Sequence, residues 1–237
     1  MNINYKALLA GLCTLLVIAF QPAQAVLVQA AFSGNDCSGF FGTGFGSCEV
    51  FIAVIEDDNG TPITVTYKLS PVIAKYDYEK AGGVDETEFN TALYSSIVGD
   101  EFSITLGDNG TGTWTYTQGT DDPGVKYWAA KASNDFNLFW EVDADVITDG
   151  ICSDTSTDQS NYNLACLQAA NVVTAGSWTT PDLKGLSHLT LYDTVPVSST
   201  GSSGGPPEGI PEPGVLALLG FGLLGGLLTR RRLTNQR

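Results

Sequence analysis

Alternating apolar and polar residues run through most of the central part of the chain. Segments 63–67 and 102–106 alternate strictly, and in segment 112–117 threonine alternates with one glycine and two large aromatic residues. A period of two places successive side chains on opposite faces of a β-strand. Three further segments are rich in aromatic or alternating apolar residues: 125–131, 136–142 and 186–192. We therefore predict β-strands in all six segments.

Turn-forming residues separate these segments. Clusters of Asp, Asn, Gly, Ser and Pro lie at 57–60, 108–110, 121–124 and 133–135. Such residues tolerate positive φ or fix a turn, and short strands at this spacing are typical of antiparallel sandwiches. The prediction is a mainly β fold, a single antiparallel, jelly-roll-like β-sandwich. Apolar spacing predicts one helix over 162–173 and allows a second short helix over 86–95.

The first 25 residues have the pattern of a secretory signal peptide. Lys6 precedes an apolar run over 7–20, and Ala23 and Ala25 form a small-x-small cleavage pattern. We predict that signal peptidase removes residues 1–25 and that the rest of the chain is exported. A retained membrane anchor is the alternative, but the apolar run is short for a span.

A second apolar segment lies near the other end of the chain. Residues 214–229 have no charged side chain, and Arg230, Arg231 and Arg232 follow directly. As a helix the segment would be about 24 Å long, short of a ~30 Å hydrocarbon core but able to insert with local thinning. Basic residues favour the cytoplasmic side. We predict a transmembrane helix with the folded domain outside.

The segment Pro211-Glu212-Pro213 directly precedes this predicted helix. The order of Pro-Glu-Pro, Gly-rich apolar helix and Arg cluster over 211–237 resembles the PEP-CTERM sorting signal. The resemblance implies an exosortase-type membrane protease as partner, an inner-membrane intermediate with a periplasmic domain, and a Gram-negative bacterium that produces exopolysaccharide. A plain anchor with an accidental Pro-Glu-Pro is the alternative.

Between the two end segments lies one acidic domain. Residues 198–210 are Ser, Thr, Gly or Pro at 11 of 13 positions, which is typical of a flexible linker, so the folded domain should cover 26–197. All 26 acidic residues but only six lysines and no arginine lie between Ala25 and Gly214, the exported part that precedes the predicted transmembrane helix, for a formal charge of −20. This charge excludes a dedicated nucleic-acid binder and should repel anionic polymers.

Four cysteines remain after signal cleavage: Cys37, Cys48, Cys152 and Cys166. An even number in an exported chain predicts two disulfides, with three possible pairings. Bridges 37–48 and 152–166 are favoured because short loops close at the lowest entropic cost. A zinc site is the alternative, but no Cys-x-x-Cys pair and no nearby histidine support it.

Residues that could carry catalysis or bind a metal form only weak patterns. His188 should share a strand face with Thr190 and Tyr192, and without a Gly-x-Ser-x-Gly elbow we expect a structural histidine. Aromatic neighbours place most of the four tryptophans in the core. Three acidic groups have ligands suitable for calcium: Asp57, Asp58 and Asn59; Asp121 and Asp122; Asp143, Asp145 and Asp149.

These observations favour a non-catalytic adhesive or structural protein of the cell surface or extracellular matrix, without a cofactor. Its association with exopolysaccharide and biofilm is what the sorting-signal resemblance implies. A secreted carbohydrate-active enzyme on a jelly-roll scaffold is one alternative, because fold does not determine function. A calcium-stabilised glycan-binding module is the other. No residue is nominated as catalytic.

Overall fold

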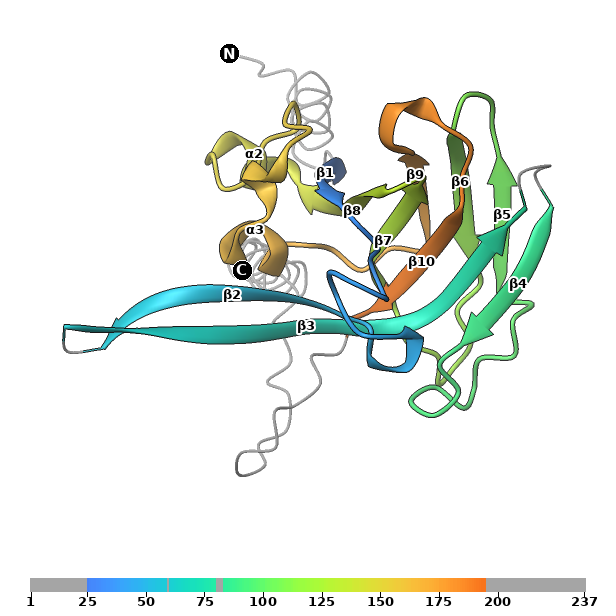
Figure 1. Ribbon diagram of the computed structural model, residues 1–237, viewed down its shortest axis with the longest axis horizontal. Helices are drawn as coiled ribbons and strands as arrows, with labels where there is room; N and C mark the ends of the chain where they lie inside the picture. The colour runs from blue at the N-terminus through green and yellow to red at the C-terminus, as the bar shows by residue number, and fades with distance from the viewer. Residues whose placement is uncertain (1–24, 59, 80–82, 195–237) are drawn as a thin grey trace, which may run out of the picture. The chain divides into compact units, whose positions relative to one another are not determined.

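The computed structural model describes residues 25–58, 60–79 and 83–194 (Figure 1). The predicted signal peptide, the linker over 198–210 and the segment over 211–237 lie outside these residues, except for Ala25, which begins the first strand. Within the described part, no helix is long and apolar enough to cross a membrane. The described chain is mainly β and antiparallel, as the alternation predicts.

Sheet I, the larger of two sheets, contains seven strands. Its order is β1 (Ala25–Ser33), β8 (Asp135–Asp143), β7 (Val125–Ala132), β10 (His188–Asp193), β3 (Thr61–Tyr78) and β2 (Glu49–Asp58), with β4 (Val84–Phe89) also on β3. Every pairing is antiparallel. The second half of β3 pairs with β10 and β4, whereas its first half pairs with β2.

Sheet II contains three strands, β5 (Phe102–Leu106), β6 (Thr111–Tyr116) and β9 (Ala175–Thr179). It packs on one face of sheet I through a buried cluster that includes Trp114, Trp128, Phe139, Trp178 and Leu189. The predicted facing antiparallel sheets are therefore present. Their division into seven and three strands differs from the eight strands of a jelly roll.

Short helices and loops cover the other face of sheet I. The α-helices are α2 (Ala144–Thr148) and α3 (Leu164–Gln168), and the 3-10 helices are η1 (Phe45–Ser47), η2 (Gln159–Asn161) and η3 (Pro181–Leu183). Phe32, Phe41, Trp140 and Leu167 are buried in the cluster on this face. The apolar face of sheet I that lacks sheet II is thus removed from water by the segments around α3 and the cysteine loops.

Two disulfides hold these covering segments. Cys37 bonds to Cys48 and Cys152 bonds to Cys166, with Cα–Cα distances of 4.8 and 5.2 Å. This pairing confirms the prediction from loop length. Within the first loop, Phe41 is buried while Phe40 stays partly exposed.

The second short helix that the spacing allows over 86–95 does not form. Residues 84–89 form β4, which pairs with β3 in a register that places Glu88 opposite Lys75, and turns follow. Strand pairing with β3 decides the conformation here over local helical spacing. The helix predicted over 162–173 forms only as α3. Asn163 caps its start, and the backbone N–H of Asn171 donates to the Glu141 carbonyl (2.7 Å), which draws the chain back to sheet I.

Candidate functional site

The single histidine lies in a buried polar network. On β10, His188, Thr190 and Tyr192 share one face, as strand alternation predicts, and all three contact Asp36. His188 Nε2 lies 2.6 Å from Asp36 Oδ1. The Thr190 hydroxyl donates to Oδ2 at 2.6 Å, and the Tyr192 hydroxyl donates to the same oxygen at 3.3 Å. Asp36 has no exposed surface.

Charged neighbours extend this network across the sheet. His188 Nδ1 lies 3.7 Å from Asp77 Oδ1, and Lys75 Nζ lies 2.5 Å from Asp77 Oδ2 and 3.7 Å from Glu88 Oε1. Burial raises the pKa of Asp36. The hydrogen bond and charge of His188, with bonds from Thr190 and Cys37, lower that pKa more strongly, to about 2. The carboxylate is therefore ionised at neutral pH.

This network has the features of an interior structural element. His188 is 5% exposed, and the hydroxyl groups of Thr190 and Tyr192 are both committed to Asp36. A nucleophilic triad needs a hydroxyl or thiol whose proton the histidine accepts, with the third carboxylate on the other ring nitrogen. The contacts instead place an aspartate on each side of the ring. The predicted structural hydrogen bond of His188 is present.

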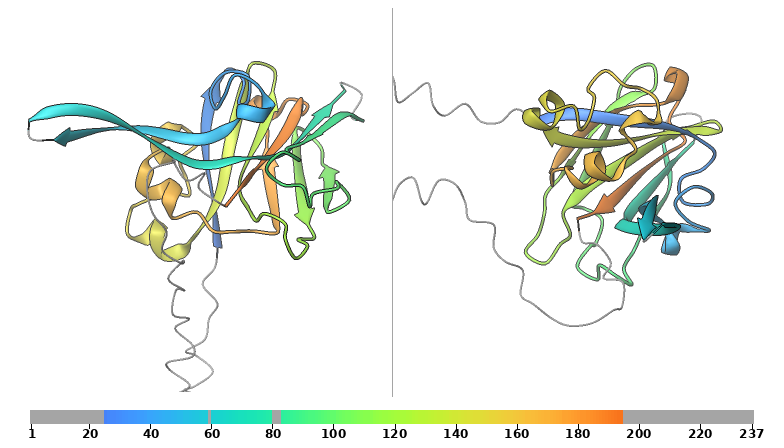
Figure 2. Two further views of the ribbon diagram at one scale, coloured as in Figure 1. Left: turned by 90° about the horizontal axis from the view of Figure 1, so that it is seen from below. Right: turned by 90° about the vertical axis from the view of Figure 1, so that its left-hand side faces the viewer.

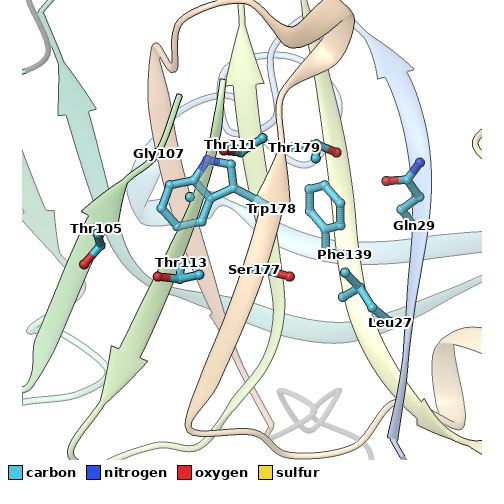
Figure 3. A pocket seen from close by; sticks show the side chains of 11 residues that line it. Leu27, Gln29, Thr105, Gly107, Thr111, Thr113, Phe139, Ser177, Trp178 and Thr179 are labelled. Carbon is cyan, nitrogen blue, oxygen red and sulfur yellow. The ribbon is translucent and has the colours of Figure 1, made fainter. Parts of the chain in front are cut away.

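A groove of about 580 Å³ lies where β9 of sheet II approaches β1 and β8 of sheet I (Figure 3). Its lining residues come from five strands and one turn: Leu27, Gln29, Thr105, Gly107, Thr111, Gly112, Thr113, Phe139, Ser177, Trp178 and Thr179. Trp178 and Phe139 are buried and contribute the apolar floor. Thr113, Ser177 and Thr179 are exposed. The groove thus combines an aromatic floor with a rim of hydroxyl groups.

Two glycines make room for the aromatic floor. Gly112 on β6 lies opposite Trp178 on β9, and Trp114 lies opposite Gly176 in the same register. A Cβ atom on Gly112 would lie 2.1 Å from the Trp178 ring, and one on Gly176 would lie 2.7 Å from the Trp114 ring nitrogen. Each indole therefore lies over the backbone of the opposite glycine, a close approach that only glycine permits.

Side chains of sheet I fix the position of β9. The Trp128 indole N–H donates to the Ser177 carbonyl, and the Asn137 side-chain amide donates to the Thr179 carbonyl, both at 2.9 Å. These bonds satisfy carbonyls at the edge of β9 that has no strand partner among the described residues, and they join the two sheets beside the groove. The groove wall is consequently held from both sheets.

No lining residue of this groove carries a charge. The exported part of the chain has 26 acidic residues against six lysines, so an uncharged hollow stands out from the rest of its surface. Threonine and serine hydroxyls and the Gln29 amide offer both donors and acceptors. The arrangement can bind an uncharged molecule that presents hydroxyl groups above an apolar face.

A second hollow, of about 690 Å³, adjoins the β5–β6 turn and shares Gly107 and Thr111 with the groove. Two exposed carboxylates, Glu79 and Asp108, belong to its lining. Leu183, which is 57% exposed, also faces this hollow. The second hollow thus differs from the groove in containing ionisable groups.

The acidic groups that suggested calcium are not assembled into a metal site in the described residues, where no group of three or more His, Cys, Asp or Glu side chains is placed to hold a metal. Local contacts use several of these carboxylates. Asp122 accepts from the Gly119 N–H, and Asp143 accepts from the Asn171 amide. A turn accounts for the contact of Asp122, and a bond between β8 and the segment after α3 accounts for that of Asp143; neither needs a metal.

The groove was not predicted from the sequence, although a signal for it exists. Gly112-Thr-Trp114 and Gly176-Ser-Trp178 repeat one Gly-x-Trp pattern. In an antiparallel pair, two such patterns place each tryptophan opposite the other's glycine. The repeat therefore indicates paired strands with tightly packed indoles, once both segments are recognised as strands.

The predicted sorting residues lie outside the described part of the chain: Ala23, Pro211, Glu212, Pro213, Arg230, Arg231 and Arg232. Residues 209–232 match the family model of the PEP-CTERM protein-sorting motif. Comparison with curated proteins and with solved structures gave no match. The motif implies export, a membrane-anchored sorting intermediate and processing by an exosortase-type protease. The chain therefore carries, near its C-terminal end, the sorting motif of PEP-CTERM proteins.

Proposed function

We propose that the exported domain is a non-catalytic, glycan-associated module of the cell surface or extracellular matrix of a Gram-negative bacterium. On this proposal, it contributes an adhesive or structural function to an exopolysaccharide matrix. The observation that carries the proposal is the uncharged groove with an aromatic floor and a hydroxyl rim.

The chemistry of the groove favours a neutral sugar chain. Sugar rings present apolar C–H faces and many hydroxyl groups. Thr113 and Ser177 supply exposed hydroxyls, and the buried Trp178 and Phe139 give the groove an apolar base with a small exposed surface. An anionic polymer would meet the repulsion of the net negative charge of the domain. We therefore expect neutral polysaccharides to bind more strongly than uronate-rich or sulfated ones.

The absence of carboxylates from the groove lining supports binding over hydrolysis. Glycoside hydrolases use two carboxyl groups about 5–9.5 Å apart across the scissile bond. No Asp or Glu is among the residues that line the groove. His188 is held between Asp36 and Asp77, away from solvent.

The second hollow makes the enzymatic alternative testable, because it includes both Glu79 and Asp108. Release of reducing ends from polysaccharides, with loss of that activity in Glu79→Gln and Asp108→Asn, would establish an enzyme and contradict our proposal. We expect no release by the wild-type protein and therefore no effect of either substitution.

Binding is tested with the protein recovered from the cell surface or medium and with neutral and anionic fractions of the cognate exopolysaccharide. We expect the double variant Thr113→Ala/Ser177→Ala to bind the neutral fraction about tenfold more weakly, since two hydrogen bonds each contribute about 0.5–1.5 kcal/mol. Thr115→Ala is the matched control, because Thr115 is exposed on the same strand and does not line the groove. Equal affinities of all three proteins would refute the groove as the glycan site.

Sorting is tested separately by replacing Pro211, Glu212 and Pro213 with alanine. The intact mass of the secreted protein, with and without reductant, should show a start at Val26, an end near Pro213 and two disulfides. The alanine variant should remain unprocessed. Unchanged processing of that variant would overturn the role of these three residues.

A further inference from the structure

Half of the β2–β3 hairpin extends beyond the rest of sheet I (Figure 1 and Figure 2). We call residues 51–58 and 61–68 the ribbon. In the register of the sheet, the ribbon half of β3 pairs with β2 alone, whereas residues 74–77 have β10 on one side and β4 on the other. One edge of the ribbon half of β3 therefore lacks a strand partner among the described residues.

The direction of the backbone groups follows from one hydrogen bond. The Tyr162 hydroxyl donates to the Phe51 carbonyl, which consequently points out of the hairpin at the outer edge of β2. In an antiparallel pair, residues directly opposite each other point both inward or both outward. Lys68, the partner of Phe51, and then Thr66 and Thr64 therefore direct their N–H and C=O groups to the free edge of β3.

This free edge has a defined length. Strand β10 pairs with β3 from Val72 onward, through Tyr192, so the edge is closed from that residue. Pro71 and Pro62 lie near its two ends and have no N–H to donate. An eight-residue segment, 63–70, remains available for pairing.

One face of the ribbon is apolar except for Glu56, which accepts a hydrogen bond from the Tyr67 hydroxyl, and this face is only partly covered. Ile52, Val54, Ile63, Val65 and Tyr67 lie on this face by register. Ile63 is 44% exposed, and Val54, Val65 and Tyr67 are half-buried. An isolated two-stranded ribbon is marginally stable in water, and an additional strand with a shared apolar face stabilises it. The ribbon thus lacks the third strand that its sequence and faces favour.

We propose that the free edge of β3 pairs antiparallel with the same edge of a second copy of the chain, about a two-fold axis at Val65. This pairing places Ile63 opposite Tyr67 and Thr64 opposite Thr66 of the other copy. β-Branched and aromatic cross-strand pairs of this kind stabilise sheets. The apolar faces of the two ribbons then continue each other in a four-stranded sheet.

The distribution of charged residues favours a second copy of the chain as the partner at this edge. The exported part of the chain has a formal charge of −20, so two copies repel each other over most of their surfaces. Residues 61–71 contain one lysine and no acid. The two-fold pairing aligns Lys68 of one copy with Pro62 of the other copy. Within that other copy, Pro62 pairs with Asp57 on β2, so the lysine of one copy and the acidic Asp57 of the other lie on the same cross-strand line. The free edge is where two copies can meet without opposing like charges.

The two-fold contact through β3 limits the assembly to two copies. The outer edge of β2 is a different edge, and Tyr162 occupies its Phe51 carbonyl. An isologous contact through one edge of β3 closes after a single partner has bound. The expected species is therefore a dimer and not an open filament.

The first test is analytical ultracentrifugation of the protein from the cell surface or medium, over a dilution series. The wild-type protein should reach twice the monomer mass. Thr64→Pro and Thr66→Pro remove N–H donors from the free edge without affecting the bonds to β2, and each should raise the dissociation constant at least tenfold. Ala53→Pro is the matched control, because by register its N–H points to the outer edge of β2. A monomer at every concentration overturns the proposal.

The second test does not depend on the proline variants being folded. Residues that face each other across an antiparallel pair lie about 4.5–5.5 Å apart, within disulfide distance. Val65→Cys should therefore form a covalent dimer, through a bond between the introduced thiols of the two copies. Ile55→Cys is the control, because Ile55 is more exposed (74%) but lies on the other strand. Equal cross-linking of both variants, or none in Val65→Cys, contradicts the two-fold pairing.

Discussion

Replacement of Asp36 by Asn perturbs the only described carboxylate that is fully buried and bonded to a histidine. Asp36 accepts bonds from His188, Thr190 and Tyr192, and it precedes Cys37, whose disulfide fixes the loop. Burial raises the pKa of Asp36, but the His188 contact and the hydroxyl donors lower it further, to about 2 from an ordinary value of 3.8. The folded protein therefore favours the ionised carboxylate.

The lowered pKa sets both a magnitude and a pH range. One pKa unit corresponds to about 1.4 kcal/mol, so the ionised carboxylate contributes about 2 kcal/mol to the free energy of unfolding. Between pH 3.8 and about 2 the unfolded chain binds a proton that folded Asp36 does not. The contribution is thus complete above about pH 4.5 and is lost as the pH falls towards about 2.

Urea unfolding of the wild-type and Asp36→Asn proteins at several pH values measures this contribution. At pH 7 the variant should be less stable by at least about 2 kcal/mol, because polar partners remain buried around an uncharged side chain. The difference should narrow by about 2 kcal/mol between about pH 5 and pH 2. Asp85→Asn, at an exposed position on β4, should show no such change. A difference between wild type and Asp36→Asn that is independent of pH would refute the reasoning.

Three other perturbations have defined outcomes. The eight tyrosines in the described residues all have raised pKa values, mainly through burial; at Tyr67 the bond to Glu56 is the main cause. The contribution of these tyrosines to the free energy of unfolding should therefore be complete below about pH 10 and decrease above it. Tyrosinate absorbance, which rises when the protein unfolds at high pH, measures this loss. Replacing Cys152 and Cys166 by alanine should lower the free energy of unfolding by about 3 kcal/mol, measured in urea. Gly112→Ala should cost about 1–3 kcal/mol through overlap with Trp178, whereas Gly185→Ala, in open space, should be neutral by the same assay.

Strand alternation identified the elements that local sequence determines. The segment 102–106 is β5, and 125–131 lies within β7, because their period of two matches faces that are buried on one or both sides. The shared face of His188, Thr190 and Tyr192 follows from the same period. The disulfide pairing was predictable for another local reason, the short separation of each cysteine pair.

Long-range pairing accounts for what the sequence did not predict. The spacing over 86–95 allows a helix, but β3 supplies a partner strand, so that residues 84–89 form β4. β2 alternates weakly, and its position beside the first half of β3 depends on the hairpin turn. The groove needs two Gly-x-Trp segments, at 112–114 and 176–178, to become neighbours although they lie far apart in sequence. The pairing of β4 with β3 and the contact between the two Gly-x-Trp segments have no signal within one window of sequence, whereas the β2–β3 hairpin has its turn signal at 57–60.

The two proposed surfaces lie on different parts of the domain, and this separation gives them a joint consequence. The groove involves β1, β5, β6, β8 and β9, whereas the free edge belongs to β3, and no residue is common to both. A dimer formed through β3 therefore presents two uncharged grooves. A polysaccharide repeats its binding unit along one chain, so the second groove binds at a high effective concentration. Weak affinity at each groove then suffices for retention in a matrix, and a dimer-deficient variant such as Thr66→Pro should lose polymer binding while keeping its affinity for a short oligosaccharide.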